Sequence, residues 1–228
     1  RKEYRLEDDT VVALKRINLE IKQGEICCIF GTSGSGKSTL LNQLAGLEKP
    51  TFGDVFIRGV PITRLSEREL AAFRQKHIGF VFQSYNLLPF MTAAENVAMP
   101  LMFRGESRRK RMKKAVAILK KVGLGNRLKH YPRQMSGGQQ QRVGIARAFV
   151  AKPDVVFADE PTGNLDSKTT IEVMDMIKSF ARRFNQTIVL VTHDPEMAQY
   201  ADRIITLVDG RIVKETINNE GEQHEQAI

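Results

Sequence analysis

The stretch that decides the fold is "GTSGSGKS" at residues 31–38, directly after the apolar run "EICCIF". It matches the pattern G-x-x-x-x-G-K-[ST] and precedes the helical pattern "TLLNQLAGL". In this context the glycines let the backbone wrap around phosphate groups, the Lys37 ammonium supplies a positive charge, and the Ser38 hydroxyl is a ligand for Mg²⁺. The sequence therefore predicts a strand, a phosphate-binding loop and a helix in succession.

Three further apolar runs end, like the first, at a polar residue. "HIGFVF" precedes Gln83, "VVFA" precedes Asp159 and "TIVLVT" precedes His193. Short, uniformly apolar runs that alternate with helical patterns are typical of a parallel sheet covered on both faces. Ligands bind beyond the carboxyl ends of such strands, so we expect these residues to converge on one site. The predicted fold class is α/β, with a mostly parallel sheet.

Other segments predict antiparallel pairs. "ALKRINLEIKQGE" reads as antiparallel strands that turn at Gln23 and Gly24, and "DVFIRGVPI" as part of a hairpin. In "RIITLVDGRIVKE", Asp209 and Gly210 separate two apolar runs, which is a strong hairpin signal. We therefore expect an antiparallel β subdomain beside the parallel sheet.

Helical periodicity interrupts the sheet pattern over residues 86–134, which predicts an inserted helical subdomain. The nucleotide-binding core, with the antiparallel β subdomain, is expected at 1–85 and 135–214. Residues 215–228 lack apolar content and are expected to form a polar tail. The prediction is a single domain over 1–228.

Composition describes an ordinary globular chain of 228 residues, 42% hydrophobic and 27% charged. No apolar run approaches the ~18 residues that a membrane span needs, and no leader marks the chain for export, so we expect a cytoplasmic protein. The adjacent Cys27 and Cys28 point to opposite faces of a predicted strand. They are interpreted as small buried hydrophobic residues in a reducing compartment.

The net charge of +9 is concentrated in "RGESRRKRMKK" at residues 104–114. Ser107 is suited to cap a helix here, and apolar residues follow at helical spacing: Met112, Ala115, Val116, Leu119 and Val122. The basic outer face of this helix is either simply solvated or close to anionic lipid head groups. No aromatic residues interleave with the basic ones to stack bases, so we expect no nucleic acid partner.

The segment "VVFADEP" offers the two carboxylates that a nucleoside triphosphatase needs. Asp159 at the strand end suits the Mg²⁺ shell, and Glu160 can polarise an attacking water. Alone, such a pair is more often a strand-end turn, but the phosphate loop favours the catalytic interpretation. His193 is either structural or a hydrogen-bond donor to a γ-phosphate, and the Gln83 amide oxygen is a candidate ligand for metal or water.

A second glycine-rich turn, "MSGGQQQR" at residues 135–142, also leads into a helix. Free backbone N–H groups and the helix dipole there suit a phosphate group. Read in order, "GTSGSGKS", "MSGGQ", "VVFADE" and His193 resemble the ATP-binding subunit of ATP-binding cassette (ABC) systems, from about residue 4 to residue 214. A P-loop kinase or a GTPase would lack "SGGQ", the Glu160 position and the late histidine.

The resemblance implies ATP and Mg²⁺ as cofactors and assigns a role to each matching residue. Implied nucleotide-binding residues are Tyr4, Gly31, Thr32, Ser33, Gly34, Ser35, Gly36, Lys37, Ser38, Thr39, Gln83, Ser136, Gly137, Gly138 and Gln139. Implied metal ligands are Ser38, Gln83 and Asp159, and implied catalytic residues are Glu160, His193 and Lys37. "GNLD", ending at Asp166, resembles the D-loop. Because the chain starts only three residues before Tyr4, the strand that precedes this tyrosine in the family is expected to be missing.

"VFQSYNLLPFMTAAENVAMPL" and "PTGNLDSKT" are similar to the group of lipoprotein-release, macrolide-efflux and bacitracin-type peptide-resistance ATPases, with the cell-division ATPase that regulates wall hydrolysis. Met135 departs from the commoner leucine but conserves apolar volume. The resemblance implies two copies that sandwich two ATP molecules and drive a separate transmembrane permease, at the inner face of the cell membrane. A regulatory, non-transport role on a membrane partner is the alternative.

The stretch after Gln83 is unusually apolar for a loop region. It contains Leu87, Leu88, Pro89, Phe90 and Met91, then Met99, Leu101, Met102 and Phe103. These residues belong either to the core of the helical subdomain or to a groove for a cytoplasmic helix of the permease. We therefore expect any permease contact near residues 84–103, with the membrane surface reached only indirectly.

Overall fold

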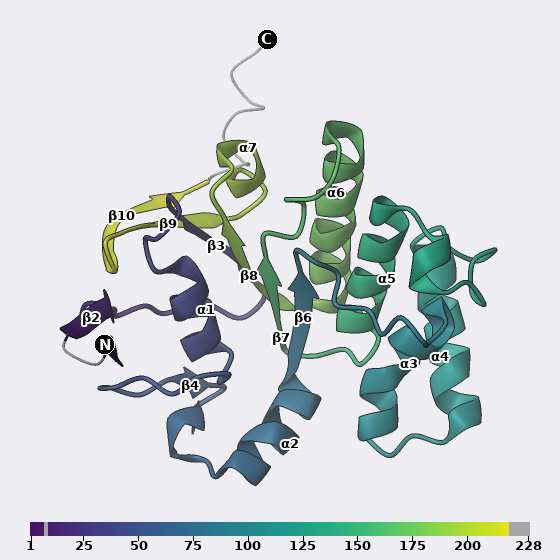
Figure 1. The fold of residues 1–228 in the computed structure, drawn as a ribbon, viewed down its shortest axis with the longest axis horizontal. Helices are drawn as coiled ribbons and strands as arrows, with labels where there is room; N and C mark the ends of the chain where they lie inside the picture. Colours follow the sequence, from purple (N-terminus) through teal and green to yellow (C-terminus); the bar gives the residue numbers. More distant parts are fainter. Residues whose placement is uncertain (7–8, 219–228) are drawn as a thin grey trace. The chain divides into compact units, whose positions relative to one another are not determined.

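A computed structural model describes residues 1–6 and 9–218 of the chain (Figure 1). Its contacts divide the chain into two compact units. The first unit comprises Arg1–Leu70 and Thr187–Ile228, and the second comprises Ala71–Gln186. Within the described residues, no helix is both long and apolar enough to cross a bilayer.

The first unit contains most of the strands. Its elements are β1 (Lys2–Leu6), β2 (Asp9–Leu14), β3 (Ile26–Phe30), α1 (Lys37–Leu44), β4 (Phe56–Ile57), β5 (Val60–Pro61), the 3₁₀ turn η1 (Ile62–Arg64), β8 (Thr187–Thr192), α7 (Pro195–Ala198), β9 (Arg203–Val208) and β10 (Arg211–Ile217). Helix α2 (Glu67–His77) begins in the first unit and ends in the second.

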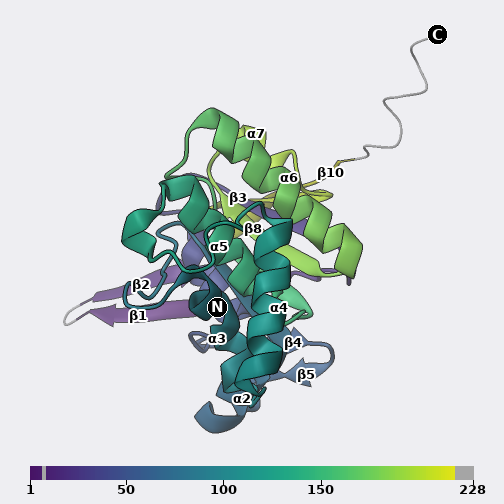
Figure 2. The same ribbon diagram turned by 90° about the vertical axis from the view of Figure 1, so that its right-hand side faces the viewer.

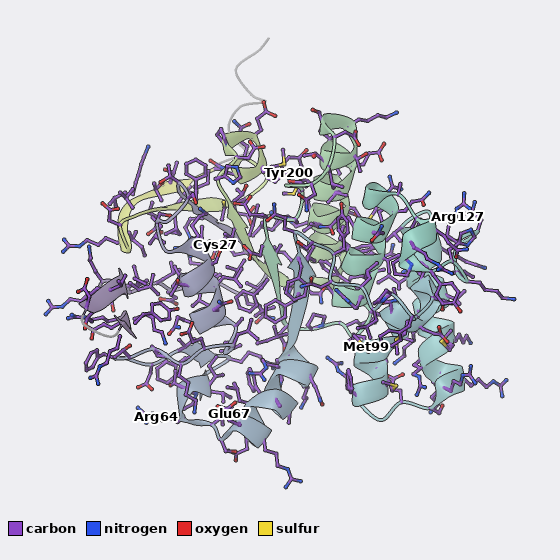
Figure 3. All side chains as sticks on the ribbon, viewed as in Figure 1. Cys27, Arg64, Glu67, Met99, Arg127 and Tyr200 are labelled. Carbon is purple, nitrogen blue, oxygen red and sulfur yellow. The ribbon has the colours of Figure 1, made fainter. Side chains whose placement is uncertain are left out.

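The core sheet of the first unit has the order β10-β9-β3-β8. Strand β3 runs parallel to both β8 and β9, and β10 is antiparallel to β9. All six residues of β8 and the first four of β3 are buried, as expected for strands covered on both faces. Cys27 lies within β3 (Figure 3), and both cysteines are fully buried. The two strands predicted from "EICCIF" and "TIVLVT" are confirmed.

Two short antiparallel pairs, β1 with β2 and β4 with β5, complete the first unit. The prediction of antiparallel strands in "ALKRINLEIKQGE" is wrong in its placement. The turn at Gln23 and Gly24 is present, but no described strand covers residues 15–22. The alternating pattern there is strand-like, but a strand also needs a hydrogen-bonding partner. Tyr4, expected to follow a missing strand, instead lies inside β1.

The second unit combines two strands with the larger helices. Its remaining elements are β6 (Ile78–Phe82), α3 (Ala93–Phe103), α4 (Arg108–Lys121), the 3₁₀ turn η2 (Pro132–Gln134), α5 (Gly137–Phe149), β7 (Val155–Asp159) and α6 (Ser167–Phe184). Strands β6 and β7 are parallel neighbours. Helices α3, α4 and α5 pack against one another (Figure 2). Parallel strands with helices in both units confirm the predicted α/β class.

The basic segment forms the amphipathic helix α4, with Ser107 at the predicted N-cap position, although its side chain makes no capping hydrogen bond. Its buried residues are Ala115, Ile118 and Leu119, and most of its lysines and arginines are exposed. At the other end of the chain, β10 extends to Ile217, so the predicted polar tail overlaps three strand residues. Glu215 within them pairs with Arg203 on β9 at 2.7 Å. Residues 219–228 of that prediction lie outside the described residues.

Candidate active site

The phosphate loop of the first unit connects β3 to α1. Gly34 and Gly36 adopt left-handed backbone conformations, with φ of 80° and 102°, and Gly36 is the N-cap of α1. Glycine tolerates these angles because it has no Cβ. Thr32, Ser33, Gly34 and Ser38 are exposed, so the loop is open to solvent on one side.

The same loop packs tightly on its other side. A Cβ atom at Gly31 would lie 2.4 Å from the Leu207 carbonyl oxygen, and one at Gly36 would lie 2.9 Å from the Ala13 carbonyl oxygen. No real side chain fits at such distances. Gly31 and Gly36 are therefore required for the loop to pack against β9 and β2.

Lys37 is the charged group of this loop. It is nearly buried, and its ammonium donates a hydrogen bond of 2.8 Å to the Thr32 carbonyl oxygen. One bond leaves two of the three ammonium donors for other partners. The buried Ser35 hydroxyl has no hydrogen-bond partner among the described residues. A cation, free donors and glycine backbone at a helix N-terminus fit a polyphosphate group.

Tyr4 and His193 flank this loop from different elements of the first unit. The Tyr4 hydroxyl donates to Glu48 at 2.8 Å and also contacts the Thr39 side chain. Burial and then the bond to Glu48 raise the pKa of Tyr4. Because Phe30 pairs with Thr192 in parallel register, Gly31 and His193 both follow paired positions at the same sheet edge.

In the second unit, Gln83 and Glu160 occupy equivalent positions. Phe82 pairs with Asp159, so Gln83 and Glu160 each follow a paired residue at the carboxyl edge of two parallel strands. Glu160 has a φ of 44°, an uncommon backbone angle for a residue with a Cβ atom. Within this unit, Gln83 and Glu160 therefore lie at the same edge of the two strands.

The loop after Glu160 packs directly on Gln83. The Asn164 side-chain amide donates to the Gln83 carbonyl oxygen at 3.1 Å. A Cβ atom at Gly163 would lie 2.7 Å from the side-chain nitrogen of Gln83, so a larger residue there would have to displace that side chain. The backbone of Gln83 is thus tied to the segment that ends at Asp166.

Ser136 caps helix α5 through a reciprocal capping box. Its hydroxyl accepts from the Gln139 N–H at 3.3 Å, and the Gln139 side chain accepts from the Ser136 N–H at 3.1 Å. Capping uses only the acceptor function of the hydroxyl. Ser136 is exposed, and its O–H group remains able to donate to a ligand. The neighbouring Met135 is buried, as expected for a leucine-like residue.

The two glycines after Ser136 allow close packing. A Cβ atom at Gly137 would lie 2.8 Å from the Tyr85 hydroxyl, and one at Gly138 would lie 2.6 Å from the Thr169 methyl group. The start of α5 therefore packs closely against both the loop after β6 and the first turn of α6.

Three buried polar residues of the second unit were missed by sequence reasoning. They are Asn96, Gln141 and Arg147, each on an otherwise apolar helix face. Gln141 donates to the Pro161 carbonyl oxygen next to Glu160, and Asn96 bonds the backbone of the loop before α3. The sequence does show each of them as a polar residue on an otherwise apolar helix face. It does not show which groups they bond, because the fold determines those partners.

The structure thus gathers the predicted residues into two groups, each within one unit. The first unit holds residues 31–39, Tyr4 and His193, and the second holds Gln83, the Asp159–Glu160 pair and residues 136–139. The strand, glycine loop and helix with a lysine at its first position define the chain as a P-loop nucleotide-binding α/β protein.

Comparison with known proteins narrows this class. Residues 14–163 match the family described as ABC transporter. The chain is 51% identical over 203 residues to an uncharacterized ABC transporter ATP-binding protein, MJ1508, of Methanocaldococcus jannaschii, a match that covers 89% of this chain and 90% of that protein. The chain therefore belongs to the ABC transporter family, as an ATPase domain that uses ATP and Mg²⁺.

Two further relatives are informative. The macrolide export ATP-binding/permease protein MacB of Rhodopirellula baltica is 46% identical over 217 residues, covering 94% of this chain but only 32% of MacB. The chain thus spans about a third of that relative. A solved dimeric post-hydrolysis structure of the ATP-binding cassette MJ0796, bound to ADP and Pi, has a TM-score of 0.88 at 44% identity and covers 95% of both chains.

Proposed function

We propose that this chain binds and hydrolyses ATP as a homodimer and thereby drives export through a separate membrane permease, at the inner face of the cell membrane. The observation that carries the proposal is the pair of phosphate-binding devices in one chain. One is the complete loop at residues 31–38, and the other is the exposed, capped turn at Ser136. One chain has two such devices because each serves a different nucleotide.

The first device holds the nucleotide of its own chain. The amides of the phosphate loop and the Lys37 ammonium bind the phosphates, and the Tyr4 ring stacks on adenine. The metal ligands are the Ser38 hydroxyl, the Asp159 carboxylate and the Gln83 amide oxygen. Mg²⁺, when bound, neutralises charge that develops on the phosphates during transfer.

Hydrolysis requires a base and an orienting group. Glu160, with its left-handed backbone at the end of β7, accepts a proton from the attacking water. His193 donates a hydrogen bond to a γ-phosphate oxygen and orients the water. Support comes from their positions, since both follow strand ends at which parallel-sheet proteins bind ligands.

The second device acts on the nucleotide of the partner copy. The free O–H of Ser136, the amides of Gly137 and Gly138, and the dipole of α5 together stabilise phosphate charge. The interface is then tight with ATP and weak after hydrolysis. The solved dimeric structures of the cassette MJ0796 support the dimer itself.

The permease contact is proposed for a methionine-rich groove of the second unit, about 290 Å³ in volume. Its apolar lining is Phe90, Met91, Ala98, Met99, Met102 and Met112, and Glu95, Arg108 and Arg111 lie at its polar edges. Met99 is visible on α3 in Figure 3. Methionine side chains adapt to the shape of a docked helix, and Phe90 is 70% exposed with no cover.

The dimer is tested by light scattering of Glu160→Gln with Mg²⁺ and ATP. We expect a dimer for Glu160→Gln and a monomer for Glu160→Gln with Ser136→Arg, although ATP still binds to each copy. Thr92→Arg is the matched control, because Thr92 caps α3 through the same kind of capping box but does not belong to the turn at residues 135–139. A dimer that survives Ser136→Arg contradicts the proposal.

A further inference from the structure

The turn between β9 and β10 is bonded to the phosphate loop. The Gly210 N–H donates a hydrogen bond of 2.9 Å to the Ser35 carbonyl oxygen, and the Gly210 carbonyl oxygen accepts one of 2.7 Å from the Lys15 N–H. The turn therefore bridges the phosphate loop and the residue that follows β2. Of Gly210, Ser35 and Lys15, only Ser35 belongs to the predicted nucleotide-binding residues.

The bond to Ser35 sets the direction of a phosphate-loop amide. In a trans peptide the C=O and the following N–H point in opposite directions. A Ser35 carbonyl held by Gly210 therefore turns the Gly36 N–H away from the hairpin. Gly36 is the N-cap of α1, where free N–H groups serve as anion donors.

We infer that the β9–β10 turn, through Gly210, is a positioning element for the phosphate loop and sets the affinity for nucleoside di- and triphosphates. The inference rests on the nucleotide site proposed above. Gly210 touches no substrate, so it is a positioning residue.

The position of Gly210 admits no side chain. A Cβ atom there would lie 2.4 Å from the Ala13 carbonyl oxygen and 3.2 Å from the Leu14 Cα. The same Ala13 oxygen lies 2.9 Å from the Cβ position of Gly36. The Ala13 carbonyl is thus enclosed between the turn and the loop, so an added methyl group at Gly210 displaces the turn from Ser35.

The chain contains a matched control in the turn between β4 and β5. Arg58 and Gly59 have φ of 54° and 76°, and Asp209 and Gly210 have φ of 45° and 72°. Both are two-residue turns with positive φ at each central position. A Cβ atom at Gly59 would meet nothing within 4 Å. Glycine-to-alanine substitution strains both turns equally, but only Gly210→Ala disturbs a packed neighbour.

Calorimetric titration of Gly210→Ala, Gly59→Ala and wild type with Mg²⁺–ADP tests the inference. We expect the dissociation constant of Gly210→Ala to rise about tenfold at unchanged stoichiometry, and that of Gly59→Ala to stay within about twofold of wild type. Partial unfolding would lower the stoichiometry instead. Equal dissociation constants for Gly210→Ala and Gly59→Ala overturn the inference, whereas a wild type that binds no nucleotide overturns the proposed function itself.

Hydrogen–deuterium exchange of the wild type covers the case in which Gly210→Ala does not fold. Mg²⁺–ADP should slow exchange in peptides that contain the β9–β10 turn, because a filled loop holds the Ser35 carbonyl more rigidly. Peptides that contain the β4–β5 turn should be unaffected. Equal exchange at the β9–β10 turn with and without Mg²⁺–ADP overturns the inference.

Discussion

The Arg147 guanidinium, buried within α5, donates a hydrogen bond of 2.8 Å to the carbonyl oxygen of Tyr85. A second bond, of 2.5 Å, reaches the Asn86 carbonyl. Both carbonyls belong to residues with positive φ, 59° and 47°. Burial lowers the pKa of Arg147, since no described carboxylate is paired with it. The helix that begins beside Ser136 therefore holds the strained loop that follows Gln83.

Replacing Arg147 should release that loop. Arg147→Met keeps the length of the side chain but leaves two partly buried carbonyls without these donors, so we expect the free energy of unfolding to fall by about 2 kcal/mol. Urea denaturation measures this loss. Arg109→Met, on the exposed face of α4, should stay within about 0.5 kcal/mol of wild type. A similar loss in both variants would contradict the proposed anchoring.

Asn96 organises the loop before α3 in the same way. Its amide group donates to the carbonyls of Leu88, Met91 and Thr92 at 3.0–3.1 Å, and its oxygen accepts from the Leu88 N–H at 2.8 Å. Asn96→Asp places a carboxylate against those carbonyls, so we expect a loss of about 3 kcal/mol at pH 7. The loss should shrink at pH 4, where a neutral carboxyl again donates. A pH-independent loss in urea denaturation would argue against this geometry.

Glu160→Gln should retain ATP binding and lose hydrolysis. The amide cannot accept the proton of the attacking water, so we expect the steady-state rate to fall by ~10² to 10⁴. Asp159→Asn should instead weaken the Mg²⁺-dependent binding of ATP. Phosphate release and nucleotide titration together separate the two. Near wild-type turnover by Glu160→Gln would remove Glu160 from the catalytic role.

Phe90→Asp tests the methionine-rich groove. A carboxylate in an apolar groove opposes docking of an amphipathic helix, so recovery of the membrane partner from detergent-solubilised membranes should fall at least tenfold. The control is Phe56→Asp, because Phe56 is similarly exposed, at 59%, on β4. Equal recovery of the partner by the two variants would place the contact elsewhere.

Cys27 should make the protein less stable at high pH. Burial raises the pKa of its thiol from 9.0 to about 12. Between these values the unfolded chain releases a proton that the folded chain keeps, so the free energy of unfolding should fall as pH rises, by up to about 1.4 kcal/mol per unit. Urea denaturation from pH 8 to pH 11 should show a steeper decline for wild type than for Cys27→Ala. Equal declines would contradict the assignment.

Strand positions followed from the sequence because they depend on local information. Each of the four apolar runs became a strand with buried residues, and the predicted site residues lie at or directly after the strand ends. The Asp209–Gly210 hairpin and the N-cap position of Ser107 were equally predictable, since their backbone angles depend on near neighbours. The missing strand at residues 15–22 shows the limit, because a strand pattern does not supply its own partner.

The sequence by itself determined the phosphate loop, the order of the catalytic candidates and the strands that carry them. Only the tertiary structure decided that Gly210 bonds Ser35, that Arg147 holds Tyr85 and that Asn96 shapes the loop at Leu88. The first two contacts join residues far apart along the chain, whereas Asn96 and Leu88 are local neighbours, and the geometry of all three depends on how strands and helices pack. Local periodicity carries no information about such pairings, whereas a buried donor or acceptor must find its partner once the fold has formed.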